Sequence, residues 1–172
     1  MSAGRTGTAP GEKPEAAPHS APDATPDAKA AWEGAYRAAI YRVLLHDGAL
    51  DLRIGLADPA ADDRLWSVLH ARHWALVTAC NPRSRPLDDD ENRQRQMELQ
   101  QALATHRQPW HDAVHVDPAG QWPDEPSCLL IDPPLELPET LGRQFDQHAI
   151  VRGAQGAAPQ LIWLTTSDKT GD

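Results

Sequence analysis

The sequence contains few cysteines, few aromatic residues and no long apolar run. Its two cysteines, Cys80 and Cys128, lie far apart, without a Cys-x-x-Cys pair or a cluster of histidines and cysteines. This spacing argues against a disulfide framework and a structural zinc site, and it fits a reducing cytosol. No apolar run approaches the length that spans a membrane, and no secretory signal is recognisable at the N-terminus. We therefore expect a soluble, cytoplasmic protein without a membrane partner.

Basic residues are also scarce, because 16 Lys and Arg stand against 25 Asp and Glu and give a net charge of -9. Such a balance opposes non-specific binding to nucleic acids, where phosphate neutralisation supplies much of the affinity. Four arginines do gather between Arg83 and Arg95, but the acidic run Asp88–Glu91 lies among them. We expect no nucleic-acid partner. The sequence does not determine the oligomeric state.

The chain divides into a tail and one domain. Residues 1–30 contain no Leu, Ile, Val, Phe, Tyr or Trp. Such a segment cannot bury enough apolar surface to offset the entropy of ordering, so we predict a disordered tail, either a tether or an extension without a specific role. A single globular domain is expected over residues 31–166, followed by a frayed end over residues 167–172.

Apolar periodicity within the domain alternates between the patterns of strands and of helices. Apolar runs and alternations predict strands over residues 40–45, 50–54, 74–78, 113–116, 127–131, 148–152 and 160–164. Asp47-Gly48 between the first two is a hairpin signal. Helical spacing is found over residues 32–39, 88–106 and 137–145. A further helix is predicted from about Asp62, and His73 is the last residue that could belong to its apolar stripe. The sum predicts an α+β fold, with a mixed, mostly antiparallel sheet of six or seven strands and two or three helices mainly on one face.

Polar, turn-forming residues follow the most apolar predicted strand, over Thr78–Arg95. Asn81-Pro82 ends this strand sharply, because a residue before proline is pushed out of the helical region. Asp88 is placed to cap the next helix with Glu91 in a capping box, which explains the acidic run better than divalent-metal binding does. We therefore expect no metal site and no cofactor.

The phase of this helix carries a sharper prediction. At about 100° per residue, Asn92 and Arg95 share the face of Leu99 and Leu103 and so turn toward the Asn81–Arg85 loop. In one interpretation they hydrogen-bond the loop backbone and hold it closed. In the other, this segment forms a pocket for a small polar or anionic ligand. The candidate ligand-binding residues are Thr78, Asn81, Arg83, Ser84, Asn92, Arg95 and Gln147.

Other candidates carry less weight. Cys80 could act as a nucleophile if His73 or His148 folds close to it, but a small apolar residue at a strand end is the better interpretation. His111 and His115 lack a third metal ligand of suitable spacing, so we expect satisfied surface histidines. We interpret Trp110 and Trp122 as lids on the core rather than as platforms for bases, Phe145 as a core residue and Gln144 as a local hydrogen-bonding residue.

Several of these residues together resemble the uncharacterised bacterial family called domain of unknown function 3293, over most of residues 36–164. The resemblance rests on Thr78-Ala-Cys-Asn-Pro-Arg-Ser84, Glu91-Asn92 with Arg95, Trp122-Pro123 with Glu125 and Ser127, and Gln144-Phe-Asp-Gln147 with Ala149. Cys80 replaces an aromatic residue and Asp146 replaces a glycine of the family pattern, so a local difference in backbone is expected near Asp146. The resemblance implies a bacterial, cytosolic, globular domain and no established activity.

The expected function is the binding of a small polar or anionic ligand, or of a partner group, at the Thr78–Arg95 segment. Amides, hydroxyls and arginines dominate this segment, and such groups bind and orient more readily than they exchange protons. An enzyme of unknown reaction that uses the same segment is the alternative, so whether the chain is an enzyme stays open. A second alternative is a protein-interaction domain that uses a sheet edge.

Overall fold

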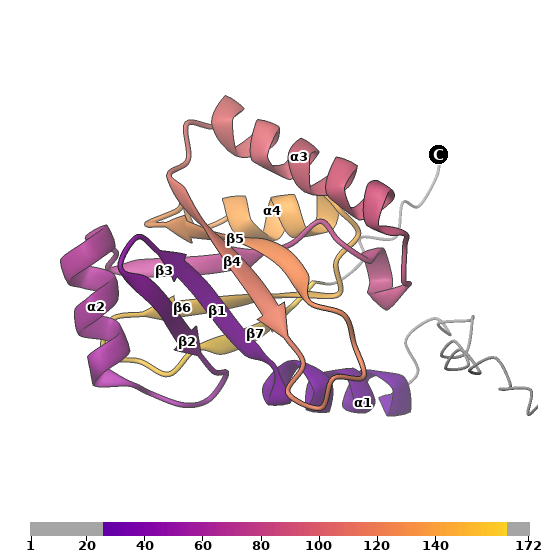
Figure 1. The fold of residues 1–172 in the computed structure, drawn as a ribbon, viewed down its shortest axis with the longest axis horizontal. Helices are drawn as coiled ribbons and strands as arrows, with labels where there is room; N and C mark the ends of the chain where they lie inside the picture. Colours follow the sequence, from indigo (N-terminus) through magenta and orange to yellow (C-terminus); the bar gives the residue numbers. More distant parts are fainter. Residues whose placement is uncertain (1–25, 165–172) are drawn as a thin grey trace, which may run out of the picture.

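Seven strands pair in one sheet, in the order β2-β1-β4-β5-β3-β6-β7, and every pairing is antiparallel. The computed structural model describes residues 26–164 (Figure 1). The strands are β1 (Ile40–Leu45), β2 (Gly48–Leu52), β3 (His73–Val77), β4 (Trp110–Val116), β5 (Glu125–Ile131), β6 (Ala149–Ala154) and β7 (Gln160–Trp163). The helices are α1 (Pro26–Ala38), α2 (Pro59–Leu69), α3 (Asp89–Thr105) and α4 (Leu137–Gln144), with a 3-10 turn, η1 (Pro82–Ser84).

The predicted α+β class with a largely antiparallel sheet is confirmed, with seven strands and with four helices where we expect two or three. His73, the last candidate of the α2 stripe, is instead the exposed first residue of β3, because α2 ends four residues earlier at Leu69. Most of the predicted tail and all of the predicted frayed end lie outside the described residues, and α1 begins at Pro26. No helix within residues 26–164 has the length and apolar character needed to cross a membrane.

The sheet curls around one apolar core. All seven strands contribute to this inner core, since each sends at least one side chain into it or against it. Such convergence requires a sheet that bends back on itself, and segments beside the two edge strands do meet. The Gly55 N–H, three residues after β2, donates to the Pro159 carbonyl just before β7, at 2.8 Å. Strand β3 is buried on both faces, as predicted, because Trp74 and Leu76 enter the inner core while Val77 enters a second, outer core.

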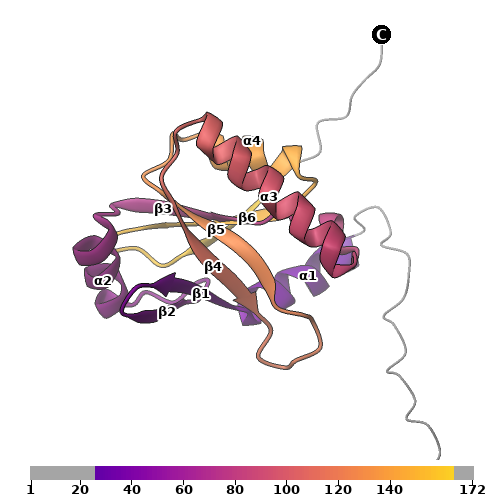
Figure 2. The same ribbon diagram turned by 45° about the horizontal axis from the view of Figure 1, so that its top comes forward.

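The helices divide between the two cores. Leucines of α3 and α4 fill the outer core, and both helices lie over the same side of the sheet (Figures 1 and 2). Ala61 and Leu65 of α2 enter the inner core, and Tyr36 of α1 packs against it. Helices α2 and α1 lie at opposite ends of the molecule in Figure 1. The α1 end of the curled sheet is therefore where the β3–α3 loop, the start of β5 and the first helix meet.

Candidate functional site

Two asparagines fix the loop between β3 and α3. The backbone N–H of Asn81 donates to Asn92 Oδ1 at 2.8 Å, and Asn92 Nδ2 donates to Asn81 Oδ1 at 2.9 Å. The same Asn81 Oδ1 accepts from the Leu87 N–H at 2.9 Å. The predicted inward turn of Asn92 is therefore confirmed. Because Asn81 is only 4% exposed, this pairing satisfies amide groups that burial would otherwise leave unpaired.

Arg95 connects the loop to the end of α4. Its Nε donates to the Ala79 carbonyl and its Nη2 to the Phe145 carbonyl, both at 2.7 Å. Gln147 Nε2 donates to the carbonyl of Cys80 at 3.0 Å and approaches that of Phe145 at 3.3 Å. Thr78 Oγ1 donates to the Pro126 carbonyl at 2.8 Å and accepts from the Cys80 N–H. Five of the seven candidate ligand-binding residues thus form hydrogen bonds between their side chains and backbone groups: Thr78, Asn81, Asn92, Arg95 and Gln147.

The backbone held by these contacts is left-handed at several positions. Asn81, Arg83 and Ser84 have φ angles of 45°, 52° and 55°, and Asp146, whose carbonyl accepts the Arg83 N–H at 2.8 Å, has a φ of 55°. Non-glycine residues seldom adopt this region, and each costs on the order of 1 kcal/mol or more. Asp146, where the resemblance implies a glycine, thus adopts a conformation that favours glycine. Strained positions of this kind cluster at binding and catalytic sites.

The outer side of the loop carries positive charge. The Arg83 side chain is 41% exposed, and its Nη2 lies 3.9 Å from Asp146 Oδ1; Arg85 is exposed and has no carboxylate partner within the described residues. His148, which stacks on Trp32 of α1 with ring centroids 4.0 Å apart, lies next to both arginines. Burial lowers the pKa of His148; a hydrogen bond with the Arg83 backbone opposes this shift, and the charges of Arg83 and Arg85 add to it. Arg83 and Arg85 therefore flank Ser84.

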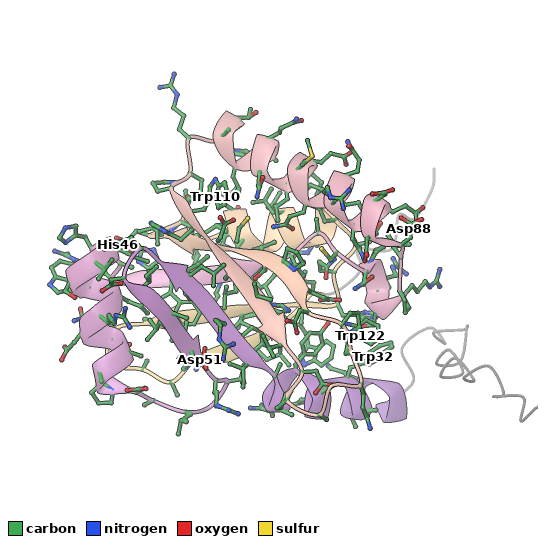
Figure 3. All side chains as sticks on the ribbon, in the orientation of Figure 1. Trp32, His46, Asp51, Asp88, Trp110 and Trp122 are labelled. Carbon is green, nitrogen blue, oxygen red and sulfur yellow. The ribbon has the colours of Figure 1, made fainter. Side chains whose placement is uncertain are left out.

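A second group of residues lies behind the loop, and we call Tyr36, Tyr41, His115, Trp122 and Glu125 the Glu125 cluster. The Glu125 carboxylate accepts from Trp122 Nε1 at 2.8 Å and from Asn81 Nδ2, and its Oε2 lies 3.8 Å from His115 Nδ1. Figure 3 shows Trp122 and Trp32 at the α1 end of the molecule. Burial alone would raise the pKa of Glu125, but the nearby His115 imidazole and the hydrogen bonds from Asn81 and Trp122 outweigh it and hold that pKa below its usual value.

The two tyrosines of the cluster are held in the neutral form. Burial raises the pKa of Tyr36 to about 12, although a hydrogen bond with the Ser84 side chain opposes the shift, and the nearby Glu125 charge adds to it. Burial also raises the pKa of Tyr41, whose hydroxyl donates to the Tyr36 carbonyl at 2.9 Å. Ser84 and Asn81 thus join the loop to the Glu125 cluster.

Sequence reasoning did not group these residues. The Asp117–Gly120 turn contained the needed signal, because β4 and β5 form a hairpin around it and pair His115 with Glu125. Tyr36 and Tyr41 could not be assigned in this way, since their approach to Glu125 depends on the pairing of β1 with β4 and on the docking of α1. The expectation of surface histidines describes His111, which is exposed, but not His115, which is half-buried beside Tyr41.

The structure also shows where the less favoured candidate residues lie. Cys80 is 1% exposed and burial raises the pKa of its thiol, so its surroundings do not favour a thiolate. Trp110 packs against the outer core, whereas Trp122 hydrogen-bonds Glu125 and is not simply a lid. Phe145 is buried in the outer core, as predicted. The capping box of Asp88 and Glu91 is confirmed, with the Glu91 N–H donating to Asp88 Oδ1 at 2.8 Å.

Two hollows on the surface lie away from the loop. One, of about 310 Å³, is lined by residues that include Pro133, Leu135 and Arg152; the other, of about 240 Å³, lies beside Leu56 and Pro159. Neither is lined by a residue of the Thr78–Arg95 segment. Within residues 26–164, no three His, Cys, Asp or Glu side chains come together in a way that could hold a metal ion.

Comparison with known proteins finds a family match that spans most of the residues of this site, and it gives no activity. No curated protein and no solved structure matches the chain. A family model described as "Protein of unknown function (DUF3293)" matches residues 77–150, which run from the end of β3 to the start of β6. This stretch contains the seven candidate ligand-binding residues together with His115, Trp122 and Glu125. Over residues 77–150, therefore, the chain is similar to the DUF3293 family.

Proposed function

We propose that this protein binds a small polar or anionic group, from a free ligand or a partner, at the loop between β3 and α3. Arg83 and Ser84 provide the contacts, joined by Arg85. The other candidate residues, Thr78, Asn81, Asn92, Arg95 and Gln147, act indirectly because they hold the loop in its binding conformation. The observation that carries the proposal is a strained, left-handed loop whose conformation is fixed from behind while its arginines stay exposed.

Preorganisation supports this assignment. A loop that is already ordered loses little entropy when a ligand binds, so its contacts are converted into affinity more fully than those of a flexible segment. Guanidinium groups also bind carboxylates and phosphates through paired hydrogen bonds. The net charge of -9 acts on a small anion less than nearby charges do, because salt screens distant charges and Arg83 and Arg85 lie on the loop itself.

The test is a thermal-shift screen followed by calorimetry, with inorganic phosphate, citrate, nucleotides, sugar phosphates and amino acids as probes. An anion present at 100 times its dissociation constant stabilises the folded state by about 2.7 kcal/mol. The double variant Arg83→Gln/Arg85→Gln should lose that stabilisation. Arg93→Gln, which removes an exposed arginine of α3 paired with Asp90, is the matched control and should keep it.

Two results would reject the proposal. One is a screen in which no anion stabilises the wild type. The other is a stabilisation that the double variant retains in full.

An enzyme that uses the same region is the second candidate, and one observation favours it. Groups with shifted pKa values, namely Glu125, Tyr36 and His148, adjoin the loop, as is common in active sites. Interaction through a sheet edge has less support, because the curl brings the segments beside the two edge strands together at the Gly55–Pro159 hydrogen bond.

A further inference from the structure

The α1 end of the inner core contains polar atoms without partners. Among the described residues, the buried side-chain nitrogen and oxygen atoms that lack a hydrogen bond are His115 Nε2, Ser127 Oγ and His148 Nε2. Buried polar groups are normally paired, with protein or with ordered water. Two of these three atoms belong to neighbouring strands, β4 and β5. This grouping points to a site rather than to scattered defects.

The register places these two side chains on one face. His115 lies opposite Glu125, and Ala113 lies opposite Ser127, so His115 and Ser127 are diagonal neighbours. Ala113 of β4 and Leu129 of β5 enter the inner core. Because side chains alternate along a strand, His115, Glu125 and Ser127 share that inner face. Ser127 is 1% exposed, so its hydroxyl has no solvent to pair with.

Glu125 lies where it can orient the imidazole. Its Oε2 is 3.8 Å from His115 Nδ1, while Trp122 and Asn81 hold its other oxygen. A lowered pKa keeps this carboxylate ionised near neutral pH. An ionised carboxylate at Nδ1 favours the tautomer with hydrogen on Nδ1 and leaves the lone pair of Nε2 available. Separations between such groups are often long before substrate binds and then tighten.

We propose that His115 is a general base, oriented by Glu125, that activates a water molecule for hydrolysis of a small carboxylic ester. Nε2 takes a proton from water as the water oxygen bonds to the carbonyl carbon. The bond from that carbon to the alcohol oxygen then breaks, and the imidazolium returns the proton to the leaving alkoxide. The Ser127 hydroxyl hydrogen-bonds the water. Glu125 is a positioning residue that does not contact the ester.

Access to this site lies beneath α1. Helix α1 reaches the cluster through the Tyr36 carbonyl, the Tyr36–Ser84 hydrogen bond and the Trp32–His148 stack. Tyr36 also packs edge-to-face on Trp163 of β7, and Lys29 lies over the same ring, while Ala39 alone joins α1 to β1. The hydrolytic role requires α1 to move outward, so that an ester can reach the inner face at Tyr41 and His115. The hydrolytic role goes beyond the binding proposed above and does not depend on it.

The experiment measures hydrolysis of 4-nitrophenyl acetate by the full chain across pH 5 to 9. This ester carries no anion, so its turnover does not require Arg83 or Arg85. We expect kcat/KM of the wild type to exceed that of His115→Gln by about 100-fold or more, the usual contribution of a positioned base. His111→Gln, an exposed histidine of the same strand, is the matched control and should stay within about twofold of the wild type, because His111 lies outside the cluster.

Ring ¹⁵N chemical shifts of labelled histidine give a second readout that needs no substrate. His115 should be the Nδ1–H tautomer in the wild type and should lose that preference in Glu125→Leu. If the Glu125 carboxylate were only structural, its removal would not change the tautomer. Equal rates for wild type and His115→Gln would overturn the proposal. So would an Nε2–H tautomer in the wild type, a result that stands even if the variants fold poorly.

Discussion

At the scale of single residues, Arg95 shows how one side chain can determine the shape of a loop. Its guanidinium bonds the carbonyls of Ala79 and Phe145, which are 66 positions apart in sequence, and stands over the Phe145 ring at 6.0 Å. An arginine can serve two carbonyls at once because its donors point in fixed, divergent directions. Lysine has a single ammonium group and cannot reproduce this geometry.

We therefore predict that Arg95→Ala lowers the free energy of unfolding by about 2 to 4 kcal/mol, since two carbonyls lose charge-assisted hydrogen bonds. Arg95→Lys should recover less than half of that loss. Urea denaturation followed by circular dichroism measures both. If the free energy of unfolding of Arg95→Ala lies within about 0.5 kcal/mol of the wild-type value, as is usual for an exposed residue, then Arg95 does not hold the loop.

At the scale of elements, the contact of β3 with β6 depends on a missing side chain. Trp74 and Gly153 are directly paired across the two strands, and a Cβ at position 153 would overlap the indole ring of Trp74. The indole lies against the bare backbone of Gly153. This close approach lets a large ring fill the inner core between two interior strands.

Gly153→Ala and Gly34→Ala should consequently have opposite effects. The first forces Trp74 from its place and should cost about 1 to 3 kcal/mol, as overpacked cores do. The second adds a methyl group in open space within α1 and should stabilise the protein by up to about 1 kcal/mol through helix propensity. Thermal unfolding of the two variants measures the difference. Equal shifts of the same sign would contradict this description of the β3–β6 contact.

At the scale of the whole molecule, the buried phenols make stability depend on alkaline pH. The folded-state pKa of Tyr36, about 12, lies above its unfolded value of 10.0. Above pH 10 the unfolded chain releases a proton that the folded chain keeps, so stability is complete below pH 10 and falls as pH rises toward 12. Tyr41 acts in the same direction.

We predict that the free energy of unfolding decreases between pH 10 and pH 12, with a shallower decrease in Tyr36→Phe. Urea titrations at a series of pH values provide the measurement, and changes in phenolate absorbance near 295 nm report ionisation directly. Parallel slopes for the two proteins would show that Tyr36 titrates normally in the folded state.

Some features of this fold can be predicted from short sequence patterns, whereas the long-range strand pairings cannot. The Asp47-Gly48 turn, the apolar run of β3 and the phase of α3 at Asn92 and Arg95 all depend on residues near in sequence. The pairing of β3 with β5 and β6 joins segments about 50 to 80 positions apart, and no short pattern encodes it. Tyr36 and Tyr41 of the Glu125 cluster were missed for the same reason, because they belong to α1 and β1 and come close to Glu125 only in the folded structure.

The strand order also has a consequence for synthesis of the chain. Strand β3, the strand most fully buried, pairs only with β5 and β6, and both follow it in sequence. As the chain leaves the ribosome, β3 has no partner until residue 125 and beyond has emerged, while the β1–β2 hairpin is complete from the start. Its apolar residues stay exposed during that interval, so β3 is the segment where a nascent chain would recruit a chaperone or misassociate.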